Sequence, residues 1–215
     1  MRQTFLAQLE ELNNDVIKMG SILELSMNEM IGALYEKDIE KAKKIIDRDD
    51  EIDLLEQHIE RECVNIIAKQ QPLASDLRKI TSIMKIITDI ERIADQCADI
   101  SEYIIKLSKY PQMEEPKSLE LMIEAMKKMV INTIDSFVEA DLEKAKAVIE
   151  ADDEVDNDFE KITDELSLTM QNKPELVPQC VCYLMIIKYL ERMADHATNI
   201  AEWITYIVTG DLTVG

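Results

Sequence analysis

The chain has 215 residues and a formal net charge of −20, because 44 acidic side chains outnumber 24 basic ones. A field of that sign repels phosphate backbones, so the composition argues against nucleic acid as a partner. Only four glycines and five prolines interrupt a chain whose aromatic content is 5 %, and this composition favours long helices over strands.

The sequence also bears on the compartment. It has no run of about 20 apolar residues, and it turns acidic at Glu10 and Glu11 without the apolar core of a signal peptide. We therefore expect a cytoplasmic protein. Four cysteines lie within helical patterns and show no CxxC spacing, which predicts reduced core thiols rather than disulfides or a zinc site: Cys63, Cys97, Cys180 and Cys182.

The first half of the chain predicts three long helices. Apolar residues recur every three or four positions over residues 4–36, the pattern of a helix that buries one stripe. Asp38 is placed to cap a second helix that runs to about residue 69 and ends before Pro72. A third helix is expected over about residues 75–109.

A seam at residues 110–116 contains two of the five prolines and separates this half from the next. After it the same cycle is expected again, with Gly210 closing the last helix. The three helices predicted here are 118–139, 141–171 and 175–208.

The two halves are copies of one unit. Residues 38–60 and 141–163 share eleven identities in 23 positions at an offset of 103. Residues 86–104 and 186–204 share nine in 19 at an offset of 100, including the charged run Glu-Arg-x-Ala-Asp. A segment that only needed to be helical would keep its apolar positions in both copies while its polar positions varied. These repeated charged side chains are therefore expected to have a functional role.

Three long helices with short connections form an up-down-up bundle in which each helix covers the apolar stripes of the other two. The duplication therefore predicts an all-α fold: a tandem, pseudo-symmetric pair of three-helix bundles with six long helices. The expected domains are residues 1–110 and 111–215.

The repeated acids are expected to gather beside the buried stripes. At about 100° per residue, acids four positions apart share a helix face, and on a helical wheel these lie along the border of the stripe. Each unit thus has two acidic pairs on neighbouring helices. They are Asp49 with Asp53 and Glu91 with Asp95 in the first unit, and Asp152 with Asp156 and Glu191 with Asp195 in the second.

Like charges brought together in this way are destabilising, and a bound cation offsets that cost. Mg²⁺, Ca²⁺ and Mn²⁺ take oxygen ligands, and iron or zinc also accept carboxylates. The competing interpretation is that Arg92, Arg192 or nearby lysines neutralise the acids as ordinary ion pairs. Arg92 follows Glu91 directly, so it is expected to point elsewhere on the helix. The pattern therefore favours metal binding over ion pairing.

These residues resemble the PhoU family of phosphate-signalling regulators, tandem three-helix bundles with a Glu/Asp-x-x-x-Asp motif on two helices of each unit. The matching motifs are Asp49-x-x-x-Asp53 with Glu91-x-x-x-Asp95, and Asp152-x-x-x-Asp156 with Glu191-x-x-x-Asp195. The likeness covers nearly the whole chain.

The resemblance implies a cytoplasmic negative regulator of phosphate uptake that links the ATPase subunit of the phosphate ABC transporter to a sensor histidine kinase. It implies a homodimer that meets the membrane only through its partners. It also implies multinuclear metal clusters, of iron, zinc, manganese or magnesium, held by the eight motif carboxylates. Asp99 and Asp89 become Asn199 and Tyr189 in the second copy, so the two sites are expected to differ.

Other classes of function have weaker support. A ferritin-like di-metal enzyme needs Glu-x-x-His, and neither His58 nor His196 follows a glutamate at that spacing. No glycine-rich phosphate loop or nucleophile constellation stands out, so we expect no enzyme. A metal-free helical adaptor remains the alternative. His196 is interpreted as a surface or edge residue, and Met122, Met126 and Met129 as core, with a docking stripe as the other reading.

Overall fold

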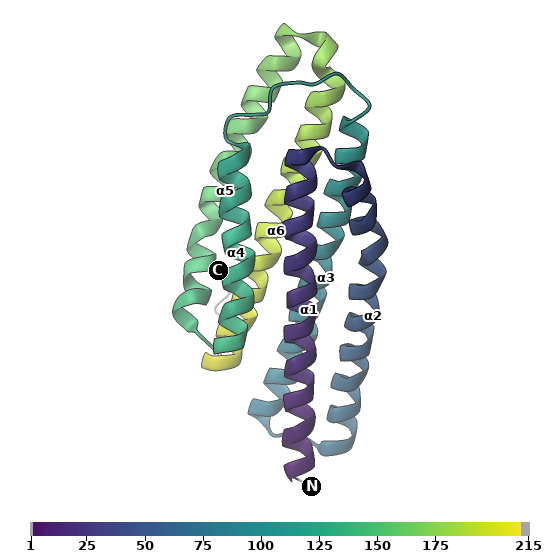
Figure 1. Ribbon diagram of the computed structural model, residues 1–215. Helices are drawn as coiled ribbons and strands as arrows, with labels where there is room; N and C mark the ends of the chain where they lie inside the picture. Colours follow the sequence, from purple (N-terminus) through teal and green to yellow (C-terminus); the bar gives the residue numbers. More distant parts are fainter. Residues whose placement is uncertain (1, 212–215) are drawn as a thin grey trace.

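A computed structural model describes residues 2–211, and over this range the chain forms six long helices and no strand. The predicted all-α tandem of three-helix bundles is confirmed (Figure 1). The first bundle consists of α1 (Arg2–Glu36), α2 (Ile39–Gln70) and α3 (Ala74–Leu107); the second consists of α4 (Leu119–Glu139), α5 (Leu142–Asn172) and α6 (Val177–Thr209), with a 3₁₀ turn at Pro174–Leu176 before α6.

Most helix ends follow from local chemistry. The side chain of Asp38 accepts a hydrogen bond from the Lys41 backbone N–H at 3.0 Å and caps α2, as the sequence predicts. Asp141 caps α5 in the same way. Just before each cap the chain reverses through a residue with positive φ, Lys37 at 56° and Ala140 at 53°. Both copies therefore use the same tight turn between their first two helices.

Several helix boundaries differ from the prediction by one or two residues. The helix α3 ends at Leu107 rather than 109, and the last helix begins at Val177 rather than 175. At α6 the reason is proline: Pro174 opens a single 3₁₀ turn, and another proline lies in the first turn of the helix, where its missing N–H costs little.

The two bundles meet along α3 and α6, which form the most extensive contact between any two helices. The helices α1 and α4 also touch in front of this pair (Figure 1). Residues 108–118 cross from α3 to α4 at the predicted seam. The third helix of each bundle, which carries half of each acid motif, therefore lies at the centre of the molecule.

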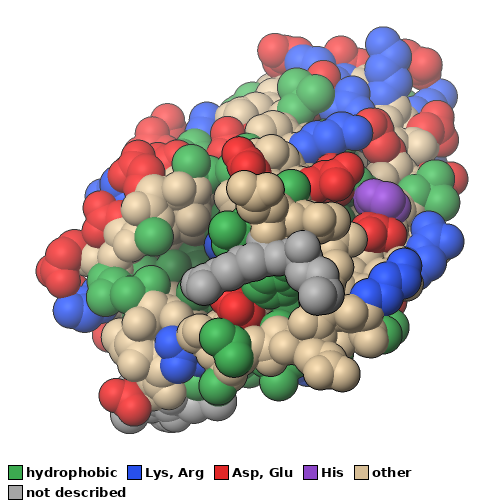
Figure 2. Space-filling view, turned by 90° about the horizontal axis from the view of Figure 1, so that it is seen from below, with side chains coloured by type: hydrophobic (Ala, Val, Ile, Leu, Met, Phe, Trp, Pro, Cys, Tyr) green, Lys and Arg blue, Asp and Glu red, His purple; other side chains and the backbone are tan. Residues whose placement is uncertain are grey.

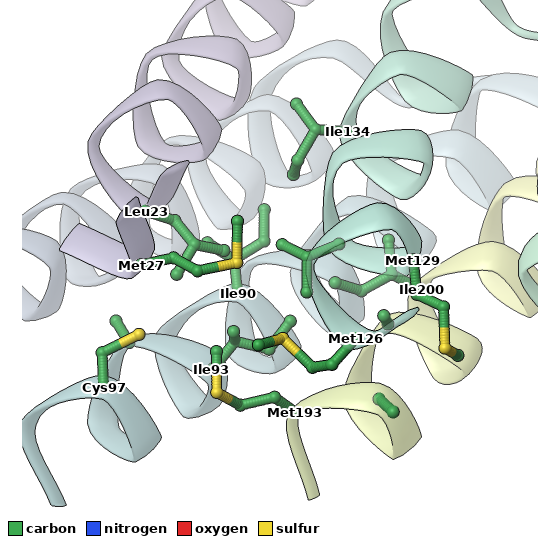
Figure 3. Close-up of a cluster of buried hydrophobic side chains, with 14 of the residues drawn as sticks. Leu23, Met27, Ile90, Ile93, Cys97, Met126, Met129, Ile134, Met193 and Ile200 are labelled. Atoms are coloured by element: carbon green, nitrogen blue, oxygen red, sulfur yellow. The ribbon is translucent and has the colours of Figure 1, made fainter. Parts of the chain in front are cut away.

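One hydrophobic core runs through both bundles. Leu23 and Met27 of α1 meet Ile90 of α3 and Met126 of α4 in a single cluster (Figure 3). Met122, Met126 and Met129 are fully or almost fully buried, so they are core residues and the docking-stripe interpretation is wrong. The prediction of reduced core thiols is confirmed, because all four cysteines are free and buried.

His196 is placed differently from the sequence interpretation. It lies between the bundles, where its Nδ1 is 2.8 Å from Oδ1 of Asp89, and both side chains are largely buried. Asn199 adds a longer contact of 3.4 Å to the same oxygen. The surface or edge assignment was wrong because the wheel of one helix cannot show that α3 covers this part of α6.

The outer surface is strongly charged. Acidic and basic side chains alternate with hydrophobic ones on the end of the molecule where the chain begins (Figure 2). Among the described residues, no helix combines the length and apolarity that a bilayer crossing needs.

The shared core yields a test of folding. Ile90 is 0 % exposed, so Ile90→Ala should destabilise the protein by about 2–5 kcal/mol through lost burial and a residual cavity. Because one core serves both bundles, thermal unfolding should remain a single transition at a lower temperature. Leu168→Ala, at a site that is 59 % exposed, is the control and should leave the midpoint nearly unchanged. Two separate transitions would contradict the shared core.

Candidate functional site

The first acid site lies between α2 and α3 and consists of Asp49, Asp53, Glu91 and Asp95. Asp49 and Asp53 are one turn apart on α2, and Asp95 faces them from α3. Each of these three aspartates offers a carboxylate oxygen, and the three oxygens lie within 4.8 Å of one another. Acids that are far apart in the sequence thus lie close together along the borders of the buried apolar stripes, as the helical wheel predicts.

Burial and mutual repulsion make these groups weaker acids than in water. Burial first, then the charges of Asp95 and Asp53, raises the pKa of Asp49 to about 6. Burial and the charge of Asp95 raise the pKa of Glu91 to about 7, against the opposing effect of Arg92. The pKa of Asp53 is also raised, chiefly by burial and by Asp95. The site therefore holds negative charge at a cost to the folded state.

Arg92 corrects one sequence expectation. Its Nε lies 3.3 Å from Oε2 of Glu91, and its Nη1 donates to Oδ2 of Asp95 at 3.0 Å. The expectation that it points elsewhere was wrong, because the long arginine side chain folds back along the helix and reaches both the preceding residue and the one a turn further on. One guanidinium, itself about half exposed, thus contacts two of the four carboxylates.

Part of this acid surface has no protein partner. Oδ1 of Asp53 and Oε2 of Glu91 are both buried without a hydrogen bond from any described residue. The Arg92 contact to Glu91 is within ion-pair distance but lacks hydrogen-bond geometry. Buried polar atoms normally have partners, so these oxygens point to a donor or cation from outside the chain.

The second acid site, between α5 and α6, consists of Asp152, Asp156, Glu191 and Asp195. It is more open, since Asp156 and Asp195 are exposed. Over residues 2–211, only the first site brings carboxylate oxygens of three acids within 4.8 Å of one another. No lysine or arginine of the described chain forms an ion pair with the second set. The duplicated motif therefore gives two sites of unequal compactness.

The electrostatics of the second site follow the same causes. Burial and the charges of Asp195 and Asp156 raise the pKa of Asp152, while the hydroxyl of Thr198, which lies nearby without hydrogen-bond geometry, opposes the rise. Partial loss of contact with water, together with neighbouring acids, also raises the pKa of Glu191 and of Asp195. Oδ1 of Asp152 is buried without a hydrogen-bond partner among the described residues. The eight predicted carboxylates are thus distributed as two sets of four.

Two residues near these sites lie outside the eight motif carboxylates. Thr198 stands where the first copy has Ala98, and the repeat alignment could have shown that a hydroxyl enters only the second site. Glu56 accepts a hydrogen bond from Thr88 at 3.0 Å, and its charge contributes to the raised pKa of Glu91. Its counterpart at the offset of 103 is Phe159, so this carboxylate is specific to the first copy.

Comparison with known proteins agrees with this architecture. The family model of the PhoU domain matches residues 16–104 and again residues 119–204, one match for each bundle. The chain belongs to the PhoU family. The resemblance expected from the motifs is therefore confirmed.

Relatives within the PhoU family match over almost the full length. A phosphate-specific transport system accessory protein PhoU homolog from Clostridium acetobutylicum is 37 % identical, with 97 % of this chain and 96 % of the relative covered. The PhoU protein of Escherichia coli is 33 % identical, with coverage of 96 % and 86 %.

Solved PhoU structures have the same fold. The crystal structure of PhoU from Pseudomonas aeruginosa gives a TM-score of 0.94 at 33 % identity, covering 96 % of this chain and 100 % of that one. The PhoU of Streptococcus pneumoniae gives 0.92 at 31 % identity, with 98 % and 100 % covered.

The raised pKa values predict how stability depends on pH. In chelator, the folded protein keeps protons on Asp49 up to about pH 6 and on Glu91 up to about pH 7, whereas the unfolded chain releases them near 3.8 and 4.5. The folded state then binds more protons, so the free energy of unfolding should fall as pH rises from about 4 to 7. Urea unfolding at stepped pH measures this slope.

The variant Asp49→Asn/Glu91→Gln should make that slope shallower, because both titrating groups are removed. Glu10→Gln, at an exposed position of α1, is the matched control and should keep the wild-type slope. An unchanged slope in the double variant would contradict the assignment of the raised pKa values to this site.

Proposed function

We propose that this chain is an accessory protein of phosphate-specific transport that acts as a negative regulator of phosphate uptake and phosphate-responsive signalling. The observation that carries the proposal is the full-length match to relatives whose names state the accessory role, together with the duplicated acid motif. The proposed mode of action is that of an adaptor between the ATPase subunit of a phosphate ABC transporter and a sensor histidine kinase. A cytoplasmic homodimer is part of the same proposal.

We further propose that both acid sites bind metal ions. The donor set supports this, because Asp49, Asp53, Glu91 and Asp95 offer only carboxylate oxygens, as do Asp152, Asp156, Glu191 and Asp195 in the second site. The buried oxygens without partners in both sites also fit such a group. Oxygen ligands suit magnesium and manganese, and iron or zinc accept them as well. A bound cation would neutralise the clustered charge and tie α2 to α3, and α5 to α6.

The metal-free adaptor is the alternative within the same family role. It draws on Arg92, which already provides positive charge to Glu91 and Asp95. An enzymatic role has less support, since the two histidines pair with Asp15 and Asp89, outside the eight carboxylates. We propose no catalytic residue.

Thermal unfolding separates the metal-binding adaptor from the metal-free one. Ligation favours only the folded state, and a metal at 100 times its dissociation constant adds about 2.7 kcal/mol. Manganese, magnesium, iron(II) or zinc should therefore raise the melting temperature relative to chelator. Asp95→Ala should remove the part due to the first site, Asp195→Ala the part due to the second, and the double variant should show no response.

Glu143→Ala is the control, because Glu143 is exposed and, among the described residues, forms an ion pair only with Lys146 one turn away. Equal melting temperatures with and without metal in all proteins would leave the metal-free adaptor. Metal analysis of untagged protein identifies the ion.

Deletion of the gene in the source cell tests the regulatory role. Loss of a negative regulator should raise phosphate uptake and phosphate-responsive transcription severalfold in phosphate-rich medium. Expression of the wild-type chain should restore both, which excludes effects on neighbouring genes. If uptake and transcription stay unchanged after deletion, the proposed role is wrong.

A further inference from the structure

A groove between α1 and α2 lies on the outside of the first bundle, away from the α2–α3 contact that holds the first acid site. We call it the first groove. It encloses about 220 Å³ and is lined by Lys18, Ile22, Glu51, Leu54, Leu55 and His58. The mechanism proposed above uses none of these residues.

The duplication provides an internal comparison for this groove. Each of its six lining residues has a counterpart 103 positions later, and all six counterparts line a groove between α4 and α5, the second groove. The fold therefore creates the same depression twice, and its two linings can be compared position by position. The counterparts are Leu121, Ala125, Glu154, Asn157, Asp158 and Lys161.

The two grooves differ in chemistry. Leu54 and Leu55 of the first groove correspond to Asn157 and Asp158 of the second, where Asp158 accepts a hydrogen bond from Lys161 at 2.7 Å. The second groove shows that this part of the fold accepts polar side chains. The fold itself therefore does not require leucines here.

Leu54 of the first groove is nevertheless exposed to solvent, whereas Leu55 is half-buried and packs against the core. Leu54 is 64 % exposed. Leu25, about one turn beyond Ile22 on α1, is 50 % exposed, and its counterpart in the second groove is Lys128. Among these positions, Leu121 shows the reverse difference, because the second groove has a leucine where the first groove has Lys18. Adjacent exposed apolar side chains bordered by polar residues are typical of a protein contact surface.

The first groove continues into an acidic pocket. His58 borders both, and the pocket adds Gln8, Glu11, Leu12, Asp15 and Glu62. Oδ2 of Asp15 lies 3.6 Å from Nε2 of His58. Together the two depressions contain four carboxylates and one lysine. A segment lying along them would meet leucine at one end and negative charge at the other.

The second copy shows that a glutamate at the position of Glu62 can accept a hydrogen bond from another segment of chain. Glu165, the counterpart of Glu62, accepts a hydrogen bond at 3.1 Å from the Lys117 backbone N–H of the linker that passes over it. Glu62 accepts one only from Asn65 of its own helix. Among residues 2–211, no other segment supplies a donor to Glu62, so this end of the first groove remains open.

We propose that the first groove and its acidic pocket dock an amphipathic helix of a partner protein, with apolar residues against Leu54 and Leu55 and with lysine or arginine near Asp15 and Glu62. Charge selects this occupant, because the first groove and the pocket together place four carboxylates against one lysine, and complementary charge favours a basic partner segment. The stretch of α1 from Leu25 to Glu11 spans about 21 Å, or roughly four turns of a docked helix. This inference does not depend on metal binding or on the phosphate role.

Fluorescence anisotropy with labelled helical peptides tests the proposal on the full chain. One probe has a leucine face and arginines at one end, and its charge-reversed form has glutamates at the same positions. Wild-type protein should bind the basic probe saturably and more tightly than the acidic one. Leu25→Lys/Leu54→Asn, which installs the second-copy residues, should weaken binding of the basic probe about tenfold or more, while the melting temperature stays unchanged.

Two further variants locate the contact. Leu121→Lys, at the exposed leucine of the second groove, should bind like wild type. Asp15→Asn/Glu62→Gln should weaken binding and reduce its dependence on salt. The proposal is overturned by absence of saturable binding, by equal affinity for both probes, or by equal losses in Leu121→Lys and Leu25→Lys/Leu54→Asn. It is also overturned if the groove mediates self-association that Leu25→Lys/Leu54→Asn abolishes.

Discussion

The packing of α3 against α6 is the constraint on which the rest of the structure depends. Each helix buries an isoleucine-rich stripe against the other bundle and also presents half of an acid motif at the border of that stripe. Burial of this apolar surface, together with the apolar stripes that α2 and α5 bury against the same two helices, supplies the free energy that holds the carboxylates together against their repulsion. The acid sites therefore depend on the core residues that pack these helices together.

This arrangement explains why the pKa values of Asp49 and Glu91 are raised above those of acids in water. A surface acid would turn toward water, whereas Asp49 and Glu91 are held on rigid helices beside other acids. The two copies relieve the repulsion differently, with Arg92 in the first and a more open setting in the second. A duplicated motif has thus become two electrostatic environments without any change in the fold.

The sequence predicted the architecture well, because periodicity, caps and the internal repeat are local properties. Asp38 and Asp141 are helix caps both in the sequence prediction and in the structure. The eight motif acids lie beside the buried apolar stripes, where the helical wheel placed them. The Arg92 contacts and the position of His196 could not be predicted in this way. The first depends on the rotamer of a long side chain, and the second on a helix that comes from the other half of the chain.

The Asp89–His196 pair has a consequence for the tandem as a whole. The position equivalent to Asp89 is Tyr189, which packs against Tyr103 with ring centroids 6.0 Å apart, and the position equivalent to His196 is Gln96. A chain built from two first halves would oppose Asp89 to glutamine, and one built from two second halves would oppose His196 to tyrosine. At this contact each half therefore contributes a residue that the other half lacks, so the two copies are not interchangeable here.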